Sequence, residues 1–124
     1  MRWFVLALVL SSAAAWGAPP AAPDSLRAEL IGHWSYQNEH SLTDITFGED
    51  GSFSGTLTRD GKVIWTFGGN WTLEGNRIFY TYTLSTPPIY AVGSMDLDTV
   101  QDMTPDCFTL INATTSVARA CRVR

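Results

Sequence analysis

Beginning near Gly32, apolar side chains recur at every second position of the chain. Ile45 and Phe47 are in phase, and the polar Thr46 lies between them. Successive side chains of a β-strand point to opposite faces, so this alternation predicts strands with one apolar and one polar face. The pattern continues through Phe53, Gly55 and Leu57; Val63, Trp65 and Phe67; Trp71 and Leu73; Ile78, Tyr80, Tyr82 and Leu84; Met95 and Leu97; and the β-prone segments 107–112 and 117–123.

Short turn motifs separate these segments. The Asp-Gly pairs at 50–51 and 60–61 are strong hairpin signals, because tight turns need residues that tolerate a positive φ. "EGN" at 74–76 and "TPD" at 104–106 mark further turns, and the two prolines at 87–88 interrupt the alternation. Glycines 68 and 69 lie within a strand, where they indicate a bulge or a sharp bend. The chain therefore reads as a meander of about eight short strands.

A short helical turn precedes the strands. Leu26 and Leu30 are four residues apart and share one helical face, and Asp24 or Ser25 is suited to cap the turn. No helical pattern follows Ile31. The sequence thus predicts an all-β domain, which either stacks as two sheets or closes into a small up-and-down antiparallel β-barrel. We favour the barrel, because closure removes the exposed strand edges that promote aggregation.

The N-terminal residues have the layout of a secretory signal peptide. Arg2 is followed by an apolar run from Trp3 to Leu10 and by small residues. The apolar run is too short to span a bilayer. Cleavage fits after Ala15 or after Gly17, and the second site is favoured. We therefore expect a signal peptide at 1–17, a Pro/Ala-rich tail at 18–24 and one domain at 25–124, secreted or periplasmic and without membrane insertion.

The net charge and the cysteine content limit the classes of partner that the protein is expected to bind. The formal charge of −4 becomes about −5 when Arg2 is removed with the leader. An acidic protein is a poor match for nucleic acid or an anionic membrane surface. Cys107 and Cys121 are the chain's two cysteines, and in an oxidising compartment they are expected to form a disulfide. We expect a monomer that binds a small apolar ligand or a protein partner.

Several motifs together resemble a known family. Gly32-x-Trp34, "ITFGEDGSFSGTL" at 45–57, "GGNWTLEGNRIFY" at 68–80 and the closing hairpin "TPDCFTLI…ARACRV" are similar to the small bacterial lipocalin-like domains of the calycin group. The resemblance implies that Trp34 lies across the closed end of the barrel. It also implies that Arg119 or Arg122 packs over the indole ring, where a guanidinium is attracted by the ring quadrupole. Gly32 allows the backbone to pass closely beneath.

The interior of such a barrel is expected to hold bulky side chains. An eight-stranded barrel is just wide enough to be filled by side chains or to hold one small ligand. We therefore expect at most a shallow cavity, and core packing is the favoured role of the aromatic residues. If there is a ligand wall, its candidates are the in-phase aromatic residues Trp65, Trp71, Tyr80 and Tyr82, together with Tyr90.

Catalytic and metal motifs are not evident. "GSFSG" resembles a nucleophile elbow, but Phe53 stands where the serine is needed. His33 and His40 are expected at the surface, and Asp96 and Asp98 on one strand face in water. Four aspartates in 96–106 leave a weak calcium site as an alternative, although the EF-hand spacing fails. We expect no enzyme activity, no cofactor and no metal.

The sequence thus favours an exported, non-enzymatic lipocalin-like protein. It would bind a small apolar or aromatic molecule, or a short peptide, at the open end of the barrel. The alternative is a protein-interaction module, such as an inhibitor of a secreted protease that acts through the N-terminal tail at 18–24. A third possibility is an envelope protein with a solid core, whose function lies in surface loops such as "STPPIY" at 85–90.

Overall fold

The structure is a computed structural model that describes residues 23–124. The predicted signal peptide and residues 18–22 of the tail lie outside these described residues. Helix α1 (Pro23–Leu30) begins ahead of the predicted domain start, and the strands are β1 (Gly32–Asn38), β2 (Ser41–Phe47), β3 (Ser52–Arg59), β4 (Lys62–Glu74), β5 (Arg77–Thr86), β6 (Met95–Gln101), β7 (Cys107–Asn112) and β8 (Val117–Arg122). Among residues 23–124, no helix is long and apolar enough to cross a membrane.

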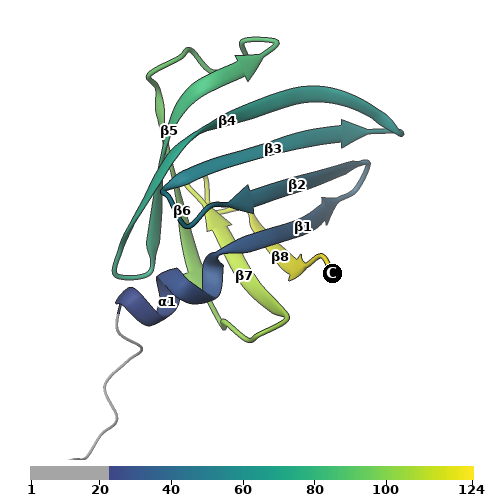
Figure 1. Ribbon diagram of the computed structural model, residues 1–124. Coiled ribbons are helices and arrows are strands. Elements are labelled where there is room, and N and C mark those ends of the chain that lie inside the picture. The colour runs from purple at the N-terminus through teal and green to yellow at the C-terminus, as the bar shows by residue number, and fades with distance from the viewer. Residues whose placement is uncertain (1–22) are drawn as a thin grey trace, which may run out of the picture.

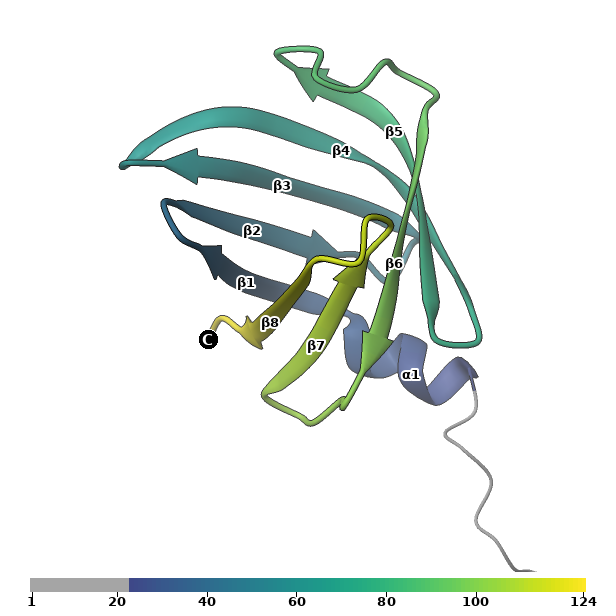
Figure 2. The same ribbon diagram turned by 180° about the vertical axis from the view of Figure 1, so that it is seen from behind.

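The strands form a closed antiparallel barrel in the order β1 to β8. Each strand pairs with the next along the chain, and β1 closes the barrel by pairing with β8 at Trp34–Arg122 and Ser35–Cys121. Figures 1 and 2 show the meander from opposite sides, with α1 across one end. The predicted all-β, eight-stranded up-and-down barrel is confirmed.

Local backbone geometry follows the turn residues. Asp60 and Gly61 have φ values of 49° and 80°, which suits the tight hairpin between β3 and β4. The pairing of β4 with β5 shifts register between Gly68 and Gly69, as expected for a bulge. A Cβ atom at Gly69 would collide with the carbonyl oxygen of Thr81, so the close approach of these strands requires glycine.

The end of the barrel next to α1 is closed by packed side chains. Leu30, Trp34 and Phe108 are fully buried there, and the rings of Trp34 and Phe108 pack edge to face with centroids 4.7 Å apart. The Trp34 indole N–H donates a hydrogen bond of 2.7 Å to the Leu30 carbonyl, which accepts it at the C-terminal end of α1. The helix and the tryptophan therefore close this end together.

Arg122 covers the outer face of Trp34. Its guanidinium carbon lies 4.2 Å from the ring centroid, and the side chain donates hydrogen bonds to the carbonyls of Glu29, Ile31 and Pro105. Gly32 has a φ of 129°, and a Cβ at this position would collide with the Arg122 guanidinium. Arg119 is exposed and donates to the Thr109 hydroxyl instead. Of the two arginines that the resemblance left open, Arg122 is the one over the ring.

A disulfide joins the last two strands at the same end. Cys107 of β7 and Cys121 of β8 are paired residues with a Cα–Cα distance of 4.0 Å. The predicted bridge is confirmed, and it is consistent with an oxidising compartment. Together, the short helix, the Gly32-x-Trp34 step and the closed meander are consistent with a calycin-like fold.

Candidate ligand-binding cavity

The barrel holds a cavity of about 350 Å³ at the end opposite α1. It is lined from the mouth down to the buried residues Ile45, Phe53 and Leu110. The cavity is deeper than the shallow one predicted. The physical reason is the distribution of side-chain size, because Phe47 and Trp71 pack near the closed end while Thr43 and Ala118 leave space above them.

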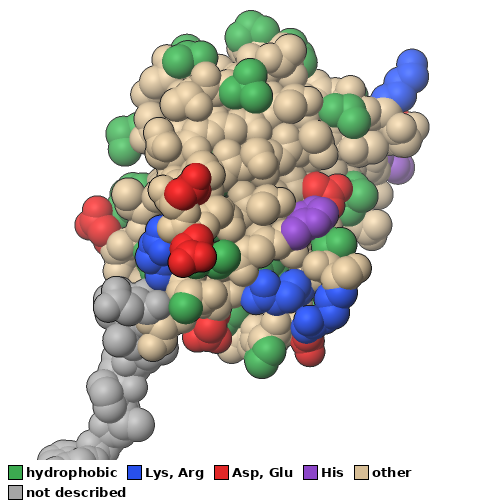
Figure 3. Space-filling model, in the orientation of Figure 1, with side chains coloured by type: hydrophobic (Ala, Val, Ile, Leu, Met, Phe, Trp, Pro, Cys, Tyr) green, Lys and Arg blue, Asp and Glu red, His purple; other side chains and the backbone are tan. Residues whose placement is uncertain are grey.

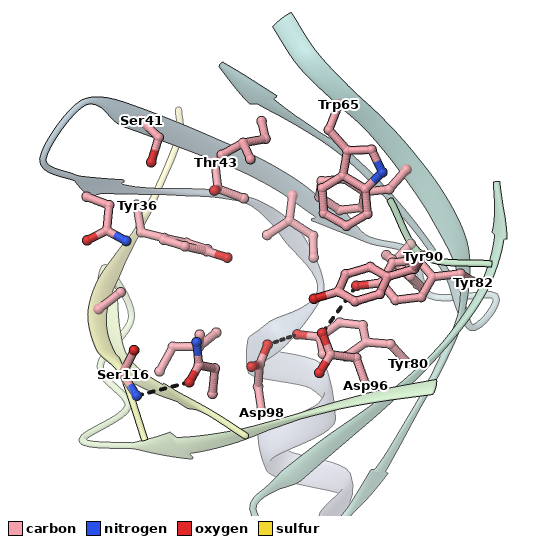
Figure 4. A pocket seen from close by; sticks show the side chains of 18 of the residues that line it. Tyr36, Ser41, Thr43, Trp65, Tyr80, Tyr82, Tyr90, Asp96, Asp98 and Ser116 are labelled. Carbon is pink, nitrogen blue, oxygen red and sulfur yellow. Dashed lines mark hydrogen bonds between the residues drawn. The ribbon is translucent and has the colours of Figure 1, made fainter. Parts of the chain in front are cut away.

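One wall of the cavity is aromatic. Trp65 of β4, Tyr82 of β5 and Tyr90 of the following loop all line the space (Figure 4). Tyr82 and Tyr90 are stacked with centroids 5.1 Å apart, and Trp65 meets Tyr90 at 5.4 Å. Ser85 holds the group together, since its Oγ accepts hydrogen bonds from the Trp65 indole N–H at 2.9 Å and the Tyr90 backbone N–H at 3.3 Å. Three of the predicted wall residues are thus brought together.

Tyr80, the fourth predicted wall residue, lies deeper and takes part in a polar floor. Its hydroxyl donates a hydrogen bond of 2.7 Å to Asp98 Oδ2 of the neighbouring strand β6. Tyr82 donates a longer bond of 3.3 Å to Asp96 Oδ2, and the Leu97 backbone N–H donates to Asp96 Oδ1. Burial and the nearby Asp98 carboxylate raise the pKa of Tyr80 well above its usual value, so this hydroxyl stays protonated and donates.

The two aspartates face the barrel interior, and the prediction that they point into water is wrong. Asp98 is only 9% exposed, and Figure 4 shows both carboxylates inside the cavity. Burial raises the pKa of Asp98 to about 6, the hydrogen bond from Tyr80 lowers it, and the charge of Asp96 raises it further. The alternation of the strand correctly places Asp96 and Asp98 on one face. Because Leu97 lies on the other face, that apolar face was expected to point into the barrel.

Tyr36 and Thr43 form the opposite side of the cavity, and neither was predicted from the sequence. Tyr36 of β1 extends across the space with its hydroxyl toward the centre, and Thr43 is its strand partner on β2 (Figure 4). Burial, followed by the charge of Asp98, raises the pKa of Tyr36 to about 12, and a hydrogen bond with Thr43 acts in the opposite direction. The sequence did contain a signal for Tyr36. It is two residues after the inward-facing Trp34, and residues two apart on a strand point to the same face.

Trp71 was predicted for the ligand wall but does not line the cavity. Its ring packs against Phe47 at a centroid distance of 5.0 Å, and Arg27 of α1 lies over it at 4.9 Å. Its indole N–H donates to the Gly48 carbonyl at 3.1 Å. Trp71 faces inward as predicted, but β4 carries it to the closed end, where it contributes to packing.

The rim of the cavity mouth is partly apolar, beside polar residues such as Asn38, Arg59 and Ser116. Exposed hydrophobic side chains occur near strand ends and in the loop between β5 and β6 at this end of the barrel, namely Val63, Leu84, Ile89, Val92, Met95 and Val117. On the face drawn in Figure 3, separate hydrophobic side chains are exposed in the upper half, whereas most charged side chains lie in the lower half near α1. An apolar rim lowers the cost of moving an apolar molecule from water into the barrel.

The side chains that line the cavity are mainly aromatic, aliphatic, hydroxyl and carboxyl groups. No histidine or cysteine is among the described residues that line it. His33 lies outside and contacts the Asp44 carboxylate at 3.0 Å. Within residues 23–124, no three His, Cys, Asp or Glu side chains come together as a metal-binding group. The arrangement can hold one small molecule between an aromatic wall and a polar floor.

No protein-family model matches the chain, and no curated protein matches it. The fold and the cavity therefore carry the functional conclusion by themselves.

Proposed function

We propose that this protein is an exported, non-enzymatic carrier that binds one small ring-bearing molecule in the open end of its barrel. The observation that carries the proposal is the cavity of about 350 Å³ with Trp65, Tyr82 and Tyr90 along one wall. Aromatic faces bind other rings through stacked or edge-to-face contacts. Such a wall around an open space favours a ligand site over a core packed solely by its own side chains.

The size of the cavity limits the ligand. Ligand pockets generally measure about 300–1,000 Å³, so this one lies near the lower limit. It suits a molecule with one ring system and a short side chain. A peptide would enter by a single aromatic side chain, with the rest of its chain lying along the apolar rim.

Export and family membership are part of the proposal. The disulfide between Cys107 and Cys121 favours a secreted or periplasmic location. The Gly32-x-Trp34 step with Arg122 over the ring supports a bacterial lipocalin-like protein. The protease-inhibitor alternative depends mainly on a tail that lies largely outside the described residues, so no contact of residues 23–124 favours it.

A native mass spectrum of the purified protein tests the proposal. We expect a discrete additional mass that disappears after denaturation and refolding. Trp65→Ala should reduce this bound fraction, whereas the matched variant Trp71→Ala should retain it, because Trp71 does not line the cavity. A bare mass, or equal loss in the two folded variants, would contradict a ligand bound at the open end.

A further inference from the structure

We infer that the bound ring carries a primary ammonium group, which enters the barrel and pairs with Asp98 on the cavity floor. This inference rests on the proposed function, because it assigns the chemistry of the ligand that the cavity holds. It starts from an imbalance of charge and hydrogen bonding inside the barrel.

Asp98 is buried without enough partners. A carboxylate has two oxygens that together accept about four hydrogen bonds, and buried charges are normally paired. Tyr80 donates one bond to Oδ2, and within the described part of the chain no protein group donates to Oδ1. The residue is 9% exposed and its side chain points into the cavity (Figure 4). The open acceptor thus faces the space that a ligand would fill.

Among the residues that the structure describes, no cation pairs with this charge. Within residues 23–124, the ion pairs are His33–Asp44 and Arg124–Asp106, and neither involves a cavity residue of β6. Arg59 is the basic side chain among the cavity's lining residues, and it is exposed at the mouth end of β3. The floor therefore carries two aspartates and no positive charge, so the field inside the barrel attracts a cation.

The groups that face Asp98 favour a positively charged donor. Tyr36 approaches from β1, Tyr80 and Tyr82 from β5, Asp96 lies on the same strand, and the β7 residues Leu110 and Asn112 do not titrate. The Asp98 carboxyl has a pKa of about 6 and is mainly ionised at neutral pH. A bound ammonium would stabilise that ionised form and lower this pKa.

The aromatic wall is compatible with the same ligand. A cation above the face of a tryptophan or tyrosine is attracted by the ring quadrupole, and the attraction is larger where water is excluded. Tyr36 has a pKa of about 12, so its hydroxyl remains neutral and can accept a hydrogen bond from an ammonium. The aromatic wall can therefore contact the ring of the ligand, while Asp98 on the floor of the same cavity pairs with its ammonium group.

Three probes with the same indole ring test the inference. Tryptamine carries an ammonium, tryptophol carries a neutral hydroxyl on the same two-carbon chain, and indole-3-propionate carries a carboxylate. Isothermal titration calorimetry at pH 7 should give a Kd for tryptamine at least about tenfold lower than that for tryptophol, with the carboxylate weakest.

Two variants separate the cavity charge from general electrostatics. Asp98→Asn keeps an acceptor for Tyr80 and should weaken tryptamine binding by about tenfold, with tryptophol binding unchanged within about threefold. Asp102→Asn removes the same charge from an exposed position outside the cavity and should leave both affinities unchanged. Retained tryptophol binding also shows that each variant is folded.

Acidification provides an independent test. Tryptamine requires the ionised form of Asp98, whose pKa is about 6, so its affinity should fall about tenfold between pH 7 and pH 5. Tryptophol affinity should stay nearly constant, because its hydroxyl also donates to a protonated carboxyl's remaining oxygen. The pH effect on tryptamine should disappear in Asp98→Asn.

The outcomes distinguish this inference from the proposed function. Equal binding of tryptamine and tryptophol, unchanged in Asp98→Asn, would overturn the ammonium assignment and leave the ring-binding function in place. Tighter binding of indole-3-propionate would overturn it as well. A failure of all three probes to bind would overturn the inference, and with a bare native mass it would also overturn the proposed function.

Discussion

The closed and open ends of the barrel each contain an inward-facing tryptophan, but the two residues have different surroundings. Trp34 is 0% exposed, donates to the Leu30 carbonyl and is covered by Arg122. Trp65 is partly exposed and lines the cavity. The comparison teaches that the alternation of a strand determines which face a residue occupies, whereas its height in the barrel determines whether it packs or binds.

The polar groups at the two ends also differ in how completely the protein itself satisfies their hydrogen bonds. At the closed end, the Arg122 guanidinium donates to three backbone carbonyls, so its hydrogen bonds are made within the protein. At the open end, Asp98 is more deeply buried than Arg122 but accepts one hydrogen bond from a protein side chain. Satisfied polar groups stabilise the fold, and incompletely satisfied ones indicate where a ligand contributes.

Truncation of the two tryptophans should have the largest effect on stability. Trp34→Ala removes a fully buried ring and should lower the free energy of unfolding by about 3–5 kcal/mol. Trp65→Ala should cost less than half of this, because its ring is partly exposed. Urea denaturation of both variants measures the difference. A similar cost for the two variants would contradict the division between the ends.

Asp98→Asn should stabilise the protein at neutral pH. Burial raises the pKa of Asp98 from 3.8 to about 6, so the native state keeps a proton that the unfolded chain has lost between these values. The stability of the native state therefore falls as pH rises from about 4 to 6. At pH 7 the replacement should gain up to about 3 kcal/mol, since one pKa unit corresponds to about 1.4 kcal/mol.

The difference in unfolding free energy between native protein and Asp98→Asn isolates this group. Measured from pH 4 to pH 8, it should grow with pH and level off above pH 7. Asp102→Asn serves as the control, because it removes the same charge from an exposed position. A difference that shrinks with rising pH would mean that the buried carboxylate has a compensating partner.

The two arginines of β8 should give the smallest of these effects. Arg122→Ala removes the cover of Trp34 and three hydrogen bonds to carbonyls, and should cost about 2 kcal/mol. Arg119→Ala is the matched control on the exposed face and should stay within about 0.5 kcal/mol. Thermal unfolding of the pair measures both, and equal losses would show that Arg122 does not contribute through Trp34.

Much of the fold could be predicted from the sequence because its signals are local. Alternation identified the strands, Asp60-Gly61 identified a hairpin, and Gly68-Gly69 identified the bulge between β4 and β5. The closed-end cluster followed from the Gly32-x-Trp34 resemblance. The sequence left open whether Arg119 or Arg122 covers the ring, because that depends on which face of β8 is turned toward Trp34.

The cavity was harder to predict because it depends on how eight strands are staggered. Trp65 and Trp71 lie on the same strand and both face inward, yet they differ in height. Asp96 and Asp98 alternate with Leu97, so hydrophobicity alone suggested the opposite face for the barrel interior. The pairing of β5 with β6 explains how these carboxyls come to face inward, because it places Asp96 opposite the inward-facing Tyr80 and Asp98 opposite the buried Ile78. The Tyr80 hydroxyl then reaches Asp98.

A two-dimensional NMR titration with tryptophol or tryptamine, followed at the indole N–H signals, tests whether ligand binding belongs to the open end of the barrel and packing to the closed end. Trp→Phe variants assign the signals of Trp34, Trp65 and Trp71. A ligand bound at the open end should shift the Trp65 signal, whose N–H lies beside the cavity and donates to Ser85, and leave the other two unchanged. Shifts of Trp34 or Trp71 with a constant Trp65 signal would contradict the assignment of binding and stability to opposite ends.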